Sequence, residues 1–357
     1  MNFSYGHNIN VLFGERELSE NDNSLYIDRL GYLYPSYTIS DSSLINSNAS
    51  LAEWYEENRE QFLKIAGQYD CTFSVYSFAN AEILNDSIIQ VAIRRIDRGR
   101  VREKTSLTFL IHGFRKNFRS VHGDSDSPTD YSTIQKKIEE YGSTTSYCKV
   151  FWDGYYGCCF SSSVKRNKPL FELYEKAQES AVLVGGTLKK ILSNVNAFDT
   201  MTIFSHSLGA KVAMYALLNI DGKNVQTPSS KKINICLVAP AISREMISKN
   251  YYRRNSLVPY QTTDNYHLFI VYNRKDFVLR KKDNQFGIFG PGPYKYGNTS
   301  LGCNHRNAAT KLRKKFSTDF PGSTILLYDR TRVGKCHKVR CYYATDNMAE
   351  VIQKLIP

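Results

Sequence analysis

The pattern of apolar and polar positions changes once along the chain. Residues 1–49 are rich in Asn, Ser, Asp and Tyr, which predicts an irregular N-terminal extension. Leu51–Ala66 carries apolar residues at helical spacing and predicts a helix. Thr72–Tyr76 and Ile88–Arg95 are rich in β-branched and aromatic residues and predict an antiparallel strand pair. We therefore expect an extension with a helix, residues 1–68, followed by one larger domain, residues 69–357.

Beyond residue 104, predicted strands alternate with predicted helices. Short apolar runs predict buried strands at Leu107–Ile111, Cys148–Trp152, Met201–Phe204, Ile233–Val238, Leu268–Tyr272 and Thr324–Tyr328. Helical periodicity marks Thr133–Tyr141, Leu170–Val195, Leu208–Leu218, Ala308–Phe316 and Met348–Leu355. This order predicts an α/β fold with a mostly parallel central sheet, an antiparallel N-terminal strand pair and helices on both faces. Ligands bind beyond the carboxyl ends of such strands, so the loops there should carry the chemistry.

The strongest motif is Ser-His-Ser-Leu-Gly at positions 205–209, between a predicted strand and a predicted helix. It is the nucleophile-elbow pattern, with Ser205 in place of the usual first glycine. The turn is tight, so residues two before and two after the nucleophile must be small. We expect Ser207 to be the nucleophile and the amide of Leu208, at the positive end of the helix, to stabilise an oxyanion. The alternative is a tight turn without chemistry.

A second motif, His112-Gly113-Phe114, ends the strand that begins at Leu107. Gly113 allows the chain to bend so that the amide of Phe114 can face a developing oxyanion. We expect His112 to hold this loop by hydrogen bonds and not to act as a base.

Together with the strand Val150-Phe151-Trp152-Asp153, these motifs resemble the α/β-hydrolase superfamily. They are most similar to poorly characterised bacterial serine esterase-like or lipase-like hydrolases, and the resemblance covers roughly residues 105–345. It implies the α/β-hydrolase fold. The sequence departs from the family at Asp153–Asn167, where the family often has a proline, and in its long N-terminal extension.

The resemblance also implies the order nucleophile, acid, base along the chain. Asp276 follows the strand Leu268–Tyr272, where family members carry their acid, and Asp283 is the weaker alternative. The base should follow the last strand, which His337 does, and His305 is the weaker alternative.

The other histidines are expected to play no part. His206 should point away from the nucleophile beside it, and His267 should lie at the wrong edge of the sheet. His7 and His122 lie in polar segments.

The implied mechanism is acyl transfer to Ser207. His337 removes the proton, Asp276 stabilises the imidazolium, and the amides of Phe114 and Leu208 bind the oxyanion. No metal or other cofactor is implied. The substrate would be a small-molecule or lipid ester. An amidase, peptidase or thioesterase on the same fold, and a non-catalytic interaction module, remain as alternatives.

Aromatic residues suggest an apolar or aryl-binding pocket formed by Trp152, Tyr155 and Tyr156. The irregular segment Gly287–Gly302 is either a lid over the site or an inert surface loop.

The net charge and the cysteine content limit which partners and which cellular compartment we expect. The chain has 47 Lys and Arg and 34 Asp and Glu residues, a net charge of +13. The basic residues match no nucleic-acid motif, so we expect a solvated basic surface, with weak association with anionic surfaces as the alternative. Nothing in the sequence indicates an oligomeric state.

The sequence contains no apolar run of the roughly 18 residues that cross a bilayer and no secretory pattern at its start. We therefore expect a cytoplasmic protein in which the 8 cysteines are reduced thiols. Adjacent Cys158 and Cys159 read as buried packing. Five Cys and His residues near the C-terminus have a spacing that matches no regular zinc site: Cys303, His305, Cys336, His337 and Cys341.

Overall fold

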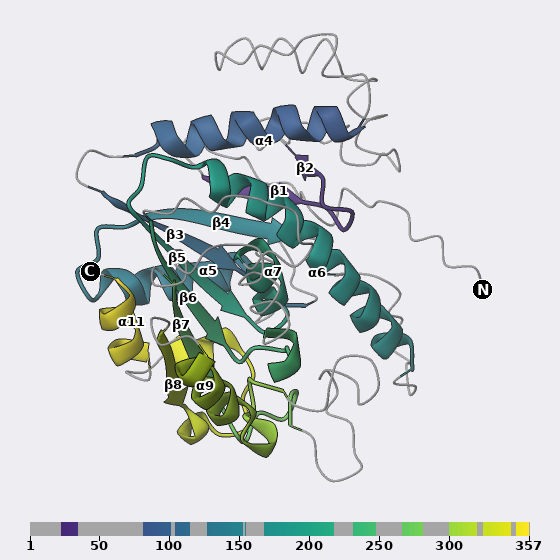
Figure 1. Ribbon diagram of the computed structural model, residues 1–357, viewed down its shortest axis with the longest axis vertical. Coiled ribbons are helices and arrows are strands. Elements are labelled where there is room, and N and C mark those ends of the chain that lie inside the picture. Colours follow the sequence, from purple (N-terminus) through teal and green to yellow (C-terminus); the bar gives the residue numbers. More distant parts are fainter. Residues whose placement is uncertain are drawn as a thin grey trace.

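A central sheet of eight strands organises the computed structural model, with the strand order β2-β1-β4-β3-β5-β6-β7-β8 (Figure 1). Every neighbouring pair is parallel except β1 with β2. The described residues are 23–34, 81–100, 104–114, 127–152, 154, 168–217, 231–247, 266–280, 300–319, 324–343 and 348–356.

The strands begin and end within about two residues of the predicted bounds from β3 onward, so those six predictions are confirmed. The strands are β1 (Ser24–Ile27), β2 (Leu33–Tyr34), β3 (Ser106–Ile111), β4 (Ser146–Trp152), β5 (Thr200–His206), β6 (Lys232–Val238), β7 (Tyr266–Tyr272) and β8 (Thr324–Asp329). All six residues of β3 are buried, as its mostly apolar sequence predicts for a strand covered on both faces.

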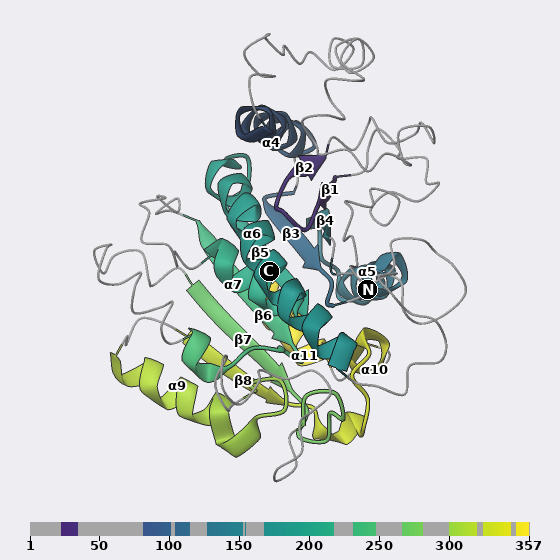
Figure 2. The same ribbon diagram turned by 90° about the vertical axis from the view of Figure 1, so that its right-hand side faces the viewer.

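Helices cover both faces of the sheet. The described helices are α4 (Ala81–Arg98), α5 (Ser127–Glu139), α6 (Lys168–Asn194), α7 (Gly209–Leu217), α9 (Ala308–Asp319), α10 (Val339–Tyr343) and α11 (Ala349–Leu355). Because β3 leads through α5 to β4, and β4 leads back through α6 to β5, right-handed crossovers put α5 and α6 on opposite faces. Figure 2 shows α6 and α7 on one face and α5 and α10 on the other.

The predicted antiparallel pair of Thr72–Tyr76 with Ile88–Arg95 is wrong. Residues 88–95 lie inside helix α4, and residues 72–76 lie outside the described residues. Isoleucine and valine favoured a strand, but over a longer window Leu84, Ile88, Ala92 and Ile96 recur every four residues and form one buried helical face.

The antiparallel pair of the sheet lies instead in the N-terminal segment that was predicted to be irregular. β1 pairs in parallel with β4, and Tyr26 of β1 faces Tyr34 of β2 in the antiparallel ladder. Helix α4 holds this edge: the amide of Leu33 donates to Oδ1 of Asn85 at 2.8 Å. The expectation of an irregular extension is therefore wrong for residues 24–34, while the helix predicted at Leu51–Ala66 lies outside the described residues.

None of the helices in the described ranges has both the length and the apolar sequence needed to span a bilayer.

Candidate active site

Four strands end at the same edge of the sheet and deliver the candidate residues there. β3 leads into His112 and Gly113, and β5 leads into Ser207. Asn273 and Asp276 follow β7. A single-turn 3-10 helix η6 (Thr331–Val333) connects β8 to the loop that carries His337. This is the carboxyl edge, where parallel sheets place their ligands.

Ser207 occupies a strained turn between β5 and α7. Its φ is 52°, in the left-handed region that few residues other than glycine adopt. The turn is fixed by two main-chain hydrogen bonds, from the Ser207 amide to the Val238 carbonyl at 3.0 Å and from the Ala241 amide to the Ser207 carbonyl at 3.0 Å. Such strain persists only where the surroundings over-determine the backbone, and it is typical of functional sites.

The structure brings Ser207, His337 and Asp276 together. Nε2 of His337 lies 2.9 Å from Oγ of Ser207, and Nδ1 of His337 lies 2.7 Å from Oδ2 of Asp276. A carboxylate only accepts hydrogen bonds, so Nδ1 carries the proton and Nε2 is free to accept from the serine hydroxyl. The three side chains therefore form one hydrogen-bonded chain with the imidazole in the tautomer of a general base.

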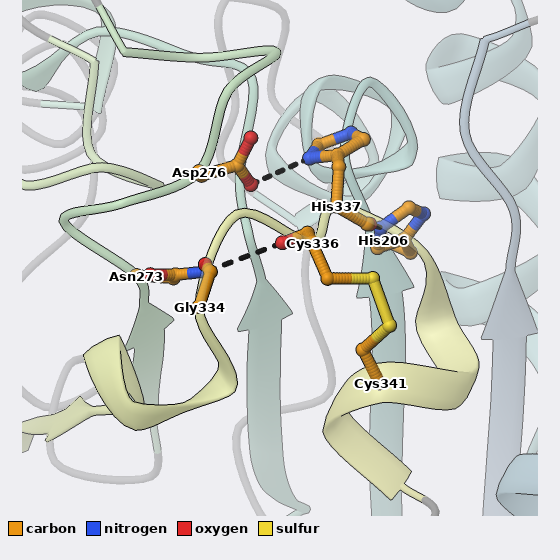
Figure 3. Close-up of a disulfide and its surroundings, with 7 residues drawn as sticks. All are labelled: His206, Asn273, Asp276, Gly334, Cys336, His337 and Cys341. Atoms are coloured by element: carbon orange, nitrogen blue, oxygen red, sulfur yellow. Dashed lines mark hydrogen bonds and ion pairs between the residues drawn. A yellow bond between two sulfur atoms is a disulfide. The ribbon is translucent and has the colours of Figure 1, made fainter.

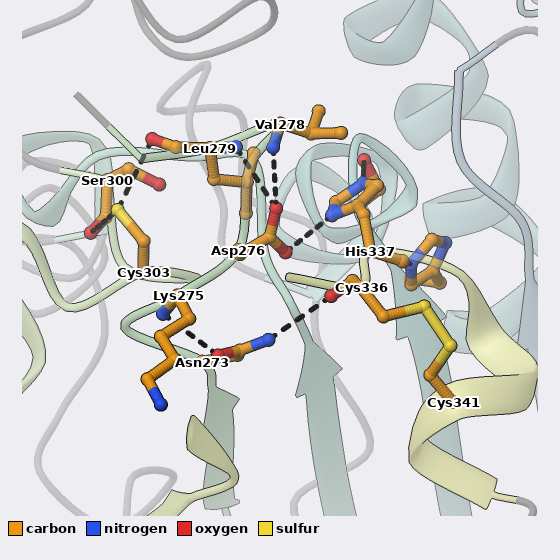
Figure 4. A network of polar contacts seen from close by, with 12 residues as sticks. Asn273, Lys275, Asp276, Val278, Leu279, Ser300, Cys303, Cys336, His337 and Cys341 are labelled. Carbon is orange, nitrogen blue, oxygen red and sulfur yellow. Dashed lines mark hydrogen bonds and ion pairs between the residues drawn. A yellow bond between two sulfur atoms is a disulfide. The ribbon is translucent and has the colours of Figure 1, made fainter. Parts of the chain in front are cut away.

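Asp276 is fixed on its other side by the backbone. Its side chain is fully buried, and Oδ1 accepts the amides of Val278 at 2.9 Å and Leu279 at 3.1 Å (Figure 4). The phenol of Tyr342 is buried near it, and burial together with the negative charge of Asp276 raises the pKa of Tyr342 well above its usual value. Asp276 thus has backbone donors on one oxygen and His337 on the other.

Two glycines allow the β3 loop to lie directly against the elbow. A methyl group added at Gly113 would lie 2.9 Å from Cβ of Ser207, and one at Gly209 would overlap the carbonyl oxygen of His112. Leu208 immediately precedes α7, so its amide belongs to the helix end whose N–H groups lack intrahelical acceptors. Phe114 follows Gly113, and its ring packs edge-on against the ring of Tyr174, with the two ring centroids 5.3 Å apart.

His112 supports this loop through both ring nitrogens. Nδ1 donates to the carbonyl of Gly113 at 2.8 Å, and Nε2 accepts the amide of Trp152 at 3.2 Å. The indole of Trp152 donates back to the His112 carbonyl at 2.9 Å, and the two rings stack. Trp152 is fully buried, and these contacts brace the loop.

The loop that carries His337 is held by groups that sequence reasoning missed. Nδ2 of Asn273 donates to the carbonyls of Gly334 at 2.7 Å and Cys336 at 3.1 Å (Figure 3). Nε2 of His206 lies 2.7 Å from the carbonyl of His337. For the contact made by Asn273, the sequence gives one signal, which is a polar residue directly after a buried strand.

Cys336 and Cys341 form a disulfide, so the expectation of reduced thiols is wrong for this pair. The cause is proximity, because the short helix α10 brings Cys341 back beside the residue that precedes His337. The other cysteines within the described ranges, Cys148, Cys236 and Cys303, are buried free thiols. No group of three or more His, Cys, Asp or Glu side chains in that part of the chain is arranged to hold a metal.

Two other histidine candidates lie away from this hydrogen-bonded chain. His305 begins the 3-10 helix η5 (His305–Asn307), and His267 lies in the first half of β7, away from the carboxyl edge. Tyr155, Tyr156, Asp283 and residues 287–299 lie outside the described residues. Ser300–Gly302 are the last residues of the segment that is predicted to be a lid or a surface loop, and they are buried.

Part of the chain is similar to a known family. Residues 162–281 match a family described as "Alpha/beta hydrolase of unknown function (DUF900)". The matched segment includes α6, the Ser207 elbow and Asp276. No curated protein matches the chain.

Proposed function

We propose that the chain, which matches an α/β-hydrolase family over residues 162–281, is a serine hydrolase that cleaves carboxylic esters. Ser207, His337 and Asp276 are its catalytic triad. The observation that carries the proposal is the hydrogen-bonded chain through His337, which spans 2.9 Å to Ser207 and 2.7 Å to Asp276. A nucleophile on a strained elbow, next to an oriented base, is the arrangement that acyl transfer requires.

In the first half-reaction, Oγ of Ser207 forms a bond to the ester carbonyl carbon while its proton passes to Nε2 of His337. The charge of Asp276 stabilises the imidazolium that results. The tetrahedral intermediate then expels the alcohol, which takes the proton from His337 and leaves an acyl group on Ser207. Water, deprotonated by His337, releases the acid and restores the hydroxyl.

The negative charge on the carbonyl oxygen is stabilised by the amides of Leu208 and Phe114. The close packing of Gly113 on Ser207 supports this role, since it keeps the β3 loop within reach of the nucleophile. The loss of one such donor costs about 10²–10³-fold in rate.

The first experiment labels the protein with a fluorophosphonate, which reacts only with an activated serine. We expect the wild type to be labelled and Ser207→Ala and His337→Ala to lose labelling. Ser205→Ala is the matched control, because this neighbouring hydroxyl donates to the Cys236 carbonyl at 3.3 Å and faces away from the base. Labelling of Ser207→Ala, or no labelling of the folded wild type, would contradict the proposal.

Substrate preference is then measured with p-nitrophenyl esters of graded acyl length and with matched anilides. We expect ester hydrolysis in the wild type and a loss of at least about 10⁴-fold in kcat for Ser207→Ala. Faster cleavage of the anilides than of every ester would make the enzyme an amidase with the same triad.

A further inference from the structure

Asn273 lies between the two loops that bring the acid and the base of the proposed triad together. It follows β7 directly and is completely buried. Its own amide donates to the Gly302 carbonyl at 2.9 Å, and its carbonyl accepts the amide of Asp276 at 3.0 Å. The backbone of Asn273 is therefore part of the turn that presents Asp276.

The side chain of Asn273 joins that turn to the base loop. Oδ1 accepts the amide of Lys275 at 2.9 Å, and Nδ2 donates to the carbonyls of Gly334 and Cys336 at 2.7 and 3.1 Å (Figures 3 and 4). The reverse orientation of the amide would set its oxygen against two carbonyl oxygens, so the network fixes the orientation. Both bonds from Nδ2 end within three residues of His337.

The base loop depends on such outside donors because it lacks regular structure of its own. Residues 334–338 lie between η6 and α10, and Gly334 has a φ of 79°. The carbonyls of Gly334, Cys336 and His337 all accept hydrogen bonds from side chains of other segments. If these partly buried carbonyls lost their donors, the loop would move to regain hydrogen bonds.

We propose that Asn273 is a positioning residue for the reaction: its amide sets the relative placement of Asp276 and His337 by tying the acid turn to the base loop. The inference rests on the proposed function. Asn273 touches neither substrate nor the reacting atoms, so its removal acts on the geometry of the base and not on substrate binding. Misplacement of a catalytic group by about 1 Å costs on the order of 10²-fold in rate.

The test uses two variants and a matched control. Asn273→Ala removes all three side-chain hydrogen bonds. Asn273→Asp keeps the acceptor for the Lys275 amide but replaces the donor to the two loop carbonyls with an oxygen. The control, Asn234→Ala, removes a buried amide that donates to the Leu355 carbonyl at 2.7 Å, and it lies near the start of β6, remote from the carboxyl edge. For each protein, kcat and KM for a p-nitrophenyl ester are measured per serine labelled by fluorophosphonate, together with thermal unfolding.

We expect kcat per labelled serine to fall about 10- to 100-fold in Asn273→Ala and at least as far in Asn273→Asp, with KM within about twofold of wild type. Asn234→Ala should lower the unfolding temperature without a change in kcat. Wild-type kcat in Asn273→Asp would overturn the proposal, as would a loss no larger than in the control. Failure of both Asn273 variants to fold, with a folded control, would make Asn273 a determinant of the fold and would also overturn it. An unlabelled, inactive wild type would instead reject the proposed function itself.

Discussion

Nε2 of His206 donates a hydrogen bond of 2.7 Å to the main-chain oxygen of His337. The residue directly before Ser207 therefore holds the residue whose imidazole bonds to Ser207. The two imidazole rings also lie close, with centroids 4.9 Å apart. Because the acceptor is a carbonyl, Nε2 of His206 must carry a proton, and His206 acts here as a donor and not as a second base.

Replacement of His206 should therefore disturb catalysis through the backbone of His337. We expect His206→Ala to lower kcat for a p-nitrophenyl ester by about tenfold, because the base loop loses a donor and can shift. His206→Gln, whose amide can still donate, should retain more activity than His206→Ala. His267→Ala, in the first half of β7, is the control and should leave kcat unchanged. Equal kcat in wild type and His206→Ala would contradict this reading.

Substitution of Gly113 should also lower activity, through steric contact with the nucleophile turn. A methyl group there would lie 2.9 Å from Cβ of Ser207 and 3.1 Å from the His206 carbonyl, so the β3 loop would have to move away from the nucleophile. We expect Gly113→Ala to lower kcat and the rate of fluorophosphonate labelling by at least about tenfold, since the oxyanion donor moves with the loop.

Gly142→Ala separates this effect from general destabilisation. Gly142 has a φ of 76° and lies just beyond α5, with no neighbour within 4 Å of an added methyl group. Its substitution should cost about 1 kcal/mol of unfolding free energy through backbone strain and leave kcat intact. Full activity in Gly113→Ala would show that the loop tolerates displacement.

The strand–helix alternation after residue 104 could be predicted from the sequence because it depends on local patterns. β3 is a short, mostly apolar run, and the Ser207 elbow is a contiguous motif whose small neighbours have a steric cause. The strand prediction for residues 88–95 is wrong because β-branched side chains favour strands, while the helical periodicity of α4 is visible only over its 18 residues.

The supports of the base could not be predicted in the same way. Asn273 and Gly334 are 61 residues apart, and His206 and His337 are 131 residues apart. The sequence around Asn273 or His206 does not predict a hydrogen bond to a main-chain carbonyl in a distant loop. Strand β1 was missed because its neighbour β4 is more than 100 residues away and its four residues give too short a pattern.

The disulfide between Cys336 and Cys341 predicts a response to reducing agents. It closes a short loop of sequence separation 5 that contains His337. In the chain-entropy view such a loop contributes about 2 kcal/mol to the unfolding free energy. We expect a phosphine reductant to lower the denaturant midpoint of the wild type and also its kcat, because the segment that carries His337 gains freedom.

The control is the double variant Cys336→Ser/Cys341→Ser, which should resemble the reduced wild type with or without reductant. The free thiols Cys148, Cys236 and Cys303 are buried and common to both proteins, so they contribute no difference. An oxidised wild type and a double variant with equal kcat would mean that hydrogen bonds alone hold the base loop.

Two adjacent glycines in helix α6 provide a stability test that is independent of the proposed chemistry. A methyl group at Gly185 would lie 2.6 Å from Cβ of Tyr215 and 2.9 Å from the Val212 carbonyl, so Gly185 is where α6 and α7 approach most closely among the described glycines of α6. At Gly186 the same group would meet nothing within 4 Å. Gly185→Ala should therefore lower the unfolding free energy by about 1–3 kcal/mol through overpacking.

Gly186→Ala should raise the unfolding free energy by about 0.5–1 kcal/mol, because alanine loses less backbone entropy in a helix. Urea unfolding measures both, and the slope of free energy against denaturant should stay the same, so that the midpoint alone reports stability. Since α7 begins two residues after Ser207, a displaced α7 in Gly185→Ala should also slow fluorophosphonate labelling, whereas Gly186→Ala should not. Equal effects of the two substitutions would contradict the close packing of α6 on α7.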